Sequence, residues 1–190
     1  MKPKICCKVI KIKEFSFEDY PFEGYELKMR GGMKPNIITL LKIKDDFKGK
    51  DLSLHSQLGR IFSCVERGFP EFSEAEMNIL KSEIIISKLI GIKQIIFHMK
   101  ESPLTKEEIK RFNEIILFAE KNGIEMVYEN HICSENVILD VLEKLPKVKF
   151  CLDIGHLNIA MKKGYFNMDI KEFLDRVSSK LVNIHAHNNY

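Results

Sequence analysis

The sequence alternates between short apolar segments and longer segments in which apolar residues recur with helical spacing. Short apolar runs bounded by turn residues are typical of buried strands, whereas recurrence at intervals of three and four residues indicates amphipathic helices. The pattern predicts seven strands, at 4–12, 24–30, 51–55, 93–98, 124–129, 148–153 and 181–187.

Helix-start signals stand between the later strands. Ser73 and Thr105 are each followed three residues later by a glutamate, which is the capping-box pattern, and we expect these helices to end at Gly91 and Gly123. Further helices are expected from Ser134 to just before Pro146, from Asp169 onward, and at 15–20 and 35–44.

Alternation of strands and helices without a linker predicts an α/β fold with a parallel sheet and helices outside it. A closed (β/α)₈ TIM barrel has eight strands and usually about 250 residues. This chain has 190 residues, so we expect a single domain over 1–190, of the barrel type but lacking the last βα unit. An open, doubly wound sheet is the alternative, although neither GxGxxG nor GxxxxGK[ST] occurs in the sequence.

Composition narrows the possible functions. Hydrophobic residues make up 45% of the chain, which is enough for a full core and excludes disorder. The net charge of only +3 argues against a dedicated polyanion binder. Five cysteines without a CxxC fit a reducing compartment rather than a disulfide framework. Lysines interrupt both the N-terminal apolar run and the stretch at 84–97, so we expect a cytoplasmic protein with no membrane partner.

Candidate chemistry lies at the strand ends. Five predicted strands end in an ionisable residue, namely His55, His98, Glu129, Asp153 and His185. In parallel α/β folds the carboxyl ends of the strands form the active-site face, so these side chains are expected to converge.

Side-chain parity agrees with this arrangement, because strand residues two apart share a face. His185 shares its face with Asn183, whereas Val182 and Ile184 face the other way and are expected to pack beneath the helices. Asp153 likewise lies opposite to the bulky residues of its strand. The ligand-type residues are therefore predicted to point into the barrel.

Two carboxylates and several imidazoles in one place are the usual ligand set of a divalent metal such as Zn²⁺, Mn²⁺, Mg²⁺ or Co²⁺. Without a metal, Glu129 and Asp153 would repel each other when buried together. A bound cation removes that penalty and can polarise a carbonyl group or activate water.

Other residues could complete the site. Gly155 is expected to permit a turn that brings His156 back over it, and His187 could be a ligand or a supporting donor. Arg60 and Lys100 could bind an anionic substrate, with solvated surface charge as the alternative. Glu26 is expected to be structural or to support a ligand, and His131 to lie at the rim.

The segments that carry these residues resemble the xylose isomerase-like TIM-barrel superfamily, which includes sugar and sugar-phosphate isomerases and epimerases and the endonuclease IV group. The matching segments are LSLHSQ (52–57), IIFHMK (95–100), EMVYEN (125–130), FCLDIGHLNIA (150–160) and VNIHAHNN (182–189). The resemblance implies metal binding by Glu129, Asp153 and His185. It also implies that His156 contacts substrate in an epimerase or a metal in an endonuclease, where His55 and His98 are metal ligands as well.

The family pattern continues past these segments to a last strand with a glutamate, which in the epimerases is a metal ligand and an acid/base residue. The sequence ends at Tyr190, before that position. Either the sequence is a shortened one or this form of the protein lacks the eighth unit. In the second case we expect exposed edges on the first and last strands, which homo-oligomerisation could cover.

Three functions remain open from the sequence. The first is a divalent-metal isomerase or epimerase of a small carbohydrate, with Glu129 as base and metal ligand and His156 orienting the substrate. The second is an endonuclease IV-like zinc phosphodiesterase acting on abasic DNA, which the near-neutral charge disfavours. The third is a barrel that binds a metal or ligand without catalysis.

Overall fold

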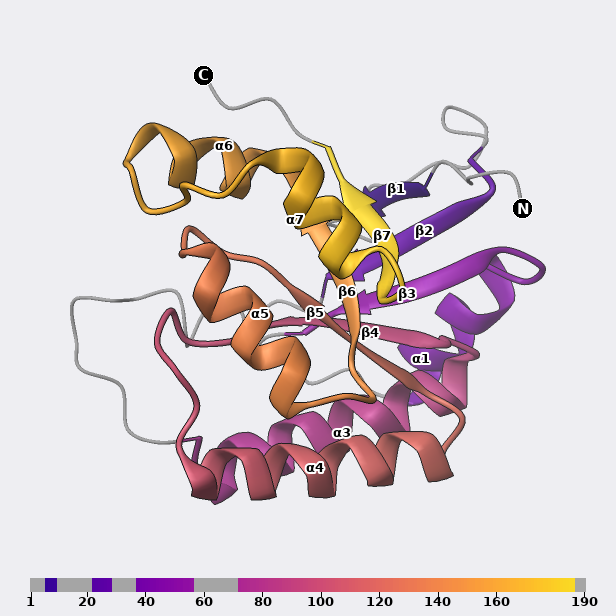
Figure 1. Cartoon of the computed structure of the whole chain (residues 1–190). Coiled ribbons are helices and arrows are strands. Elements are labelled where there is room, and N and C mark those ends of the chain that lie inside the picture. Colours follow the sequence, from indigo (N-terminus) through magenta and orange to yellow (C-terminus); the bar gives the residue numbers. More distant parts are fainter. Residues whose placement is uncertain (1–5, 10–21, 29–36, 57–71, 187–190) are drawn as a thin grey trace.

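A computed structural model describes residues 6–9, 22–28, 37–56 and 72–186, and over these ranges the chain forms one parallel sheet (Figure 1). The strands are β1 (Cys6–Val9), β2 (Gly24–Lys28), β3 (Asp51–His55), β4 (Gln94–His98), β5 (Glu125–Glu129), β6 (Lys149–Asp153) and β7 (Leu181–His185). Each lies within its predicted range, so the prediction of seven strands is confirmed.

The strands pair in the order β1-β2-β3-β4-β5-β6-β7 without a reversal. A doubly wound sheet reverses its strand order at a switch point, so this order excludes that alternative and is that of a barrel wall. The sheet also curls, because His185 at the end of β7 reaches Glu26 on β2 although the two strands are not paired.

Six helices are described, and α3, α4 and α5 lie on the outer side of the sheet (Figure 1). Their bounds are α1 (Ile37–Asp46), α3 (Glu74–Ile90), α4 (Lys106–Lys121), α5 (Glu135–Lys144), α6 (Ile154–Lys162) and α7 (Ile170–Val177). Both predicted capping boxes are present, at Ser73 with Glu76 and at Thr105 with Glu108. Gly91 ends α3 with a φ of 88°, a left-handed conformation that glycine adopts without a steric cost. The helix expected at 15–20 falls outside the described residues.

One prediction at the end of β6 is wrong. The sequence suggested that Gly155 forms a turn, whereas the structure continues directly from β6 into α6, with Gly155 in the first helical turn. Asp153 is the N-cap residue of this helix, and its side chain accepts a hydrogen bond from the backbone N–H of His156 at 2.7 Å. The N-cap bond satisfies one of the donors that a helix leaves unpaired at its start.

Two apolar regions flank the strands. On the outer face, strand residues such as Phe97 and Phe150 are fully buried against the aromatic side chains of α4 and α7. Inside the barrel, Ile96, Val127 and Cys151 form a small separate cluster. His98, Glu129 and Asp153 each lie two residues further along the same strand than a member of this cluster, so they share its interior face.

The outer face of β7 differs from the prediction. Val182 and Ile184 are 40% and 57% exposed, so they do not pack beneath any helix of the described ranges. The reason is that α7 directs Phe173 onto Phe150 of β6 rather than onto β7. Across the described residues, every helix is too short or too polar to span a bilayer.

Candidate metal centre

The carboxyl ends of five neighbouring strands, β3 to β7, bring together the residues that the sequence predicted. The strand register sets His98 beside Glu129 and Asp153 beside His185. His55, His98, Glu129 and Asp153 are all buried, and His185 is half-buried. Residues spread over the sequence thus meet at one end of the barrel because parallel strands end on the same side.

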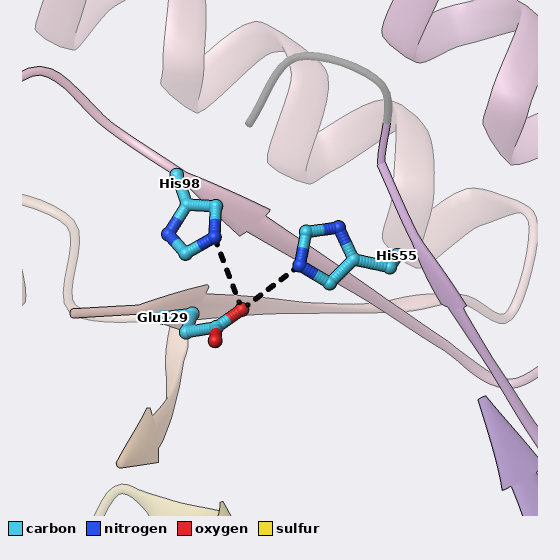
Figure 2. A group of neighbouring side chains, drawn as sticks. All are labelled: His55, His98 and Glu129. Carbon is cyan, nitrogen blue, oxygen red and sulfur yellow. Dashed lines mark ion pairs between the residues drawn. The ribbon is translucent and has the colours of Figure 1, made fainter. Parts of the chain in front are cut away.

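Glu129 lies in the middle of a first group, with His55 and His98 (Figure 2). Its Oε2 atom lies 3.1 Å from Nε2 of His55 and 3.3 Å from Nε2 of His98. Both imidazoles point their Nε2 atoms at the same carboxylate oxygen, as Figure 2 shows. One ligand atom from each residue lies within 4.8 Å of the other two, a spacing that fits a metal ion.

The same glutamate belongs to a second group, with Asp153 and His185. Its other oxygen, Oε1, lies 2.8 Å from Nδ1 of His185. Ligand atoms of these three residues also lie within 4.8 Å of one another. Glu129 therefore joins two overlapping groups of candidate ligands, one through each carboxylate oxygen.

The electrostatics of Glu129 and His98 favour cation binding. Burial alone would raise the pKa of Glu129, but contacts with His185 and His55 lower it well below its usual range, so the carboxylate is charged. Burial lowers the pKa of His98 to about 3 despite the attraction of Glu129, so this imidazole is neutral at pH 7 and can offer a lone pair. Neutral imidazole and charged carboxylate are the forms in which these side chains bind metals.

His185 lies between two carboxylates. Its Nδ1 faces Glu129, and its Nε2 lies 2.7 Å from Oε2 of Glu26 on β2. Burial opposes protonation, but hydrogen bonds with Cys151, Glu129 and Glu26 outweigh it and raise the pKa of His185 to about 12. In the metal-free chain His185 is therefore an imidazolium, and it must release a proton before it can bind a cation.

A buried asparagine, which the sequence analysis did not single out, holds the Asp153 side of the site. The Asn130 side chain donates to the backbone carbonyl of Asp153 at 3.1 Å and accepts from its N–H at 2.7 Å. The backbone carbonyl of Asn130 accepts a hydrogen bond from Nδ1 of His156 at 3.0 Å. The only signal for Asn130 in the sequence is its position directly after a strand-end ligand.

Two further histidines border the site. The His131 ring lies 4.7 Å from that of His156 and 5.4 Å from that of His98, measured between centroids. Nδ1 of His131 also contacts the carboxylate of Glu101, a residue that sequence reasoning missed. His131 is half-buried, as expected for a rim residue.

Of the three predicted substrate-binding residues, the structure describes Lys100 alone. Arg60 and His187 lie outside the described residues. The ammonium group of Lys100 lies 2.6 Å from Oε2 of Glu108, whose side chain is 1% exposed. This ion pair accounts for Lys100 without a ligand, and substrate binding by Arg60, His187 and Lys100 stays a prediction.

Buried polar atoms without a hydrogen bond indicate whether the residues of the site fit a metal ion. Among the described residues, Oε2 of Glu129 and Nδ1 of His98 are buried without a hydrogen bond. A buried polar atom without a hydrogen bond is costly, and a cation among Glu129, His55 and His98 would satisfy the carboxylate oxygen. The residues present therefore fit a divalent metal.

Comparison with known proteins identifies the fold family. Residues 22–190 match the family model described as "Xylose isomerase-like TIM barrel". The chain belongs to this family. No curated protein matches the sequence significantly.

Solved structures of the xylose isomerase-like family share the fold at low sequence identity. A xylose isomerase domain protein from Planctomyces limnophilus is 13% identical with a TM-score of 0.75, and the match covers 96% of this chain and 72% of that one. A D-tagatose 3-epimerase-like protein is 17% identical with a TM-score of 0.69, covering 96% and 76%. D-psicose 3-epimerase from Clostridium cellulolyticum, solved with D-tagatose, is 15% identical with a TM-score of 0.64, covering 86% and 62%.

Proposed function

We propose that the chain is a divalent-metal isomerase or epimerase acting on a small carbohydrate. The observation that carries this proposal is the central place of Glu129, whose carboxylate contacts His185 through one oxygen and His55 and His98 through the other. The names of the structural neighbours, which include tagatose, psicose and ribulose epimerases, support a carbohydrate substrate.

Glu129, Asp153 and His185 would hold the catalytic metal. When bound, such an ion supplies Lewis acidity to a carbonyl oxygen and a neighbouring hydroxyl of the substrate. Three hydrogen bonds hold Asp153 in place. Two join its backbone to the side chain of Asn130, and in the third its carboxylate accepts from the backbone N–H of His156. A ligand held in this way needs little reorganisation when the site is loaded.

Two residues of the chain would handle the substrate. Glu129 would take a proton from the carbon next to the carbonyl group, because it is the carboxylate common to both ligand groups. His156 donates from Nδ1 to a backbone carbonyl, which fixes the tautomer with the lone pair on Nε2. Nε2 could then accept a hydrogen bond from a substrate hydroxyl, or bind a second metal.

The test is solvent-deuterium incorporation at the carbon next to the carbonyl, measured by NMR on a panel of ketoses and ketose phosphates with Mn²⁺, Co²⁺, Zn²⁺ or Mg²⁺. We expect Glu129→Gln to abolish exchange. The matched control is Glu125→Gln on the same strand, because Glu125 contacts Gln94 and belongs to neither ligand group. Exchange that survives in Glu129→Gln would remove Glu129 from the role of base.

A second candidate function, a zinc phosphodiesterase, has one observation in its favour. The group of His55, His98 and Glu129 could hold another ion beside the first, and two metals bridged by a carboxylate are suited to phosphodiester cleavage. Metal content by mass spectrometry together with nicking of an abasic duplex tests this function. Two or more zinc equivalents with nicking would favour it, and failure to bind any divalent ion would favour a non-catalytic barrel.

A further inference from the structure

Glu26 contributes a buried carboxylate to the site from a strand distant in the sheet. It lies on β2, is 5% exposed, and places Oε2 2.7 Å from Nε2 of His185. The two residues are 159 positions apart in sequence. Among the described residues, Glu26 belongs to neither candidate ligand group, and it contacts the site at His185.

The contact distinguishes the two nitrogens of His185. A neutral imidazole carries a proton on one nitrogen and a lone pair on the other, so only one of them can bind a metal. In the metal-free chain Nε2 donates to Glu26 at 2.7 Å and Nδ1 donates to Glu129 at 2.8 Å. Glu129 belongs to both candidate ligand groups and Glu26 to neither, so a cation beside Glu129 would take the place of the proton on Nδ1, while the proton on Nε2 stays with Glu26.

The ring orientation follows from the same two contacts. Each nitrogen of His185 faces a different carboxylate, and those carboxylates stand on β2 and β5. Turning the ring over would direct Nε2 away from Glu26 and Nδ1 away from Glu129. The parallel stacking of His185 on His55, with ring centroids 6.4 Å apart and planes 18° apart, is consistent with one fixed orientation.

We propose that Glu26 is a positioning residue that makes Nδ1 of His185 the metal-ligating atom. The inference rests on the proposed metal function, since it assigns the ligand atom of that centre. A carboxylate behind a ligating histidine fixes its tautomer and raises its basicity, and losing such a partner typically weakens metal affinity about 10–100-fold.

The experiment uses the full chain with ¹⁵N-labelled histidine, loaded with zinc. Long-range ¹H–¹⁵N NMR spectra report which nitrogen of each imidazole carries the proton and which binds the metal. The chain has six histidines, and the spectrum of His185→Asn assigns the signals of His185. We expect zinc on Nδ1 and a proton on Nε2, and zinc on Nε2 would overturn the proposal.

Zinc affinity gives a second readout, measured by competition with a chelator. We expect Glu26→Leu to weaken zinc binding about 10–100-fold and to lose the proton signal of Nε2. Glu26→Gln keeps an acceptor oxygen for Nε2, so it should keep zinc on Nδ1 and lose less affinity. Glu125→Gln, which alters a half-buried carboxylate that contacts Gln94, should match the wild type.

The outcomes separate the inference from the function on which it rests. Equal zinc affinity of wild type and Glu26→Leu, with both folded by circular dichroism, would overturn the role of Glu26 alone. Absence of zinc binding by the wild type would overturn the metal centre and this assignment together. Should Glu26→Leu fail to fold, the nitrogen bound by zinc in the wild type still decides the proposal.

Discussion

Asn130 pairs with the backbone of Asp153 through both ends of its side-chain amide. The amide nitrogen donates to the carbonyl of Asp153 at 3.1 Å, and the amide oxygen accepts from its N–H at 2.7 Å. Asn130 directly follows the candidate base Glu129, so this pair links the ends of β5 and β6 at the centre of the site. The position of the Asp153 carboxylate relative to Glu129 is therefore set by a fully buried neutral side chain.

We expect Asn130→Ala to lower the free energy of unfolding by about 1–3 kcal/mol, because it leaves the N–H and the carbonyl of Asp153 buried without these partners. Zinc affinity should fall as well, since Asp153 would no longer be held. Urea unfolding and a zinc titration measure the two effects. The matched control is Asn122→Ala, because Asn122 bonds to Phe118 at the end of α4 and belongs to neither candidate ligand group. Unchanged zinc affinity in Asn130→Ala would contradict the role assigned to Asn130.

The convergence of the strand-end residues could be predicted from the sequence because only two regularities were needed. Alternation along a strand decides which side chains share a face, and a parallel sheet puts all carboxyl ends on one side. Both hold for His98 and Glu129, which the strand register sets side by side. Neither regularity depends on details of packing.

The supporting residues could not be predicted in the same way. The bonds of Asn130 join residues 23 apart, and that of Glu26 joins residues 159 apart, so they depend on strand register and on the curl of the sheet. Helix α6 was missed because Gly155 was interpreted as a turn. Glycine weakens a helix, but here the N-cap bond of Asp153 starts the helix in spite of it.

Metal binding should stabilise the chain by mass action. At a zinc concentration 100 times the dissociation constant, the free energy of unfolding rises by about 2.7 kcal/mol. For a chain of this size each kcal/mol raises the midpoint of thermal unfolding by about 2–4 °C, so the midpoint should rise by several degrees. We expect Asp153→Ala to lose this gain. If the group of His55, His98 and Glu129 also binds zinc, His98→Ala should lose one zinc equivalent by mass spectrometry, while the group that contains Asp153 still holds the other. A thermal midpoint of the wild type that does not respond to any divalent ion would contradict the metal centre.

The metal-free chain should lose stability as the pH falls below 6.5, because of His98. Its pKa is about 3 in the folded chain and 6.5 when unperturbed, so between these values the unfolded chain binds the extra proton. The free energy of unfolding should therefore fall with decreasing pH by up to about 1.4 kcal/mol per pH unit.

Two other residues of the site affect the free energy of unfolding in other ranges of pH. The raised pKa of His185 stabilises the folded chain fully below 6.5 and loses this effect as the pH rises toward 12. The lowered pKa of Glu129 stabilises it above 4.5 and loses this effect at lower pH. Between pH 4.5 and 6.5, His98→Gln should thus flatten the pH dependence of urea unfolding measured with a chelator. An unchanged slope in that variant would show that another group titrates there.

Lys100 offers a test between a structural role and the predicted substrate contact. Its ammonium group lies 2.6 Å from Glu108, a buried carboxylate that also accepts from the backbone N–H of Thr105 in the capping box of α4. Burial raises the pKa of Glu108, but Lys100 and Thr105 outweigh this effect and lower it, so the carboxylate is charged. Lys100→Met leaves that charge without its cation and should lower the free energy of unfolding by about 1–3 kcal/mol.

The control for Lys100→Met is Lys171→Met, which breaks a pair with Asp175 on α7 in which both side chains are exposed. Exposed pairs contribute at most about 1 kcal/mol, so this variant should unfold at nearly the urea concentration of the wild type. The double variant Lys100→Met with Glu108→Gln should recover part of the loss, because it removes the buried charge along with its partner. Unchanged stability of Lys100→Met combined with a raised KM for a phosphorylated sugar would instead assign Lys100 to the substrate.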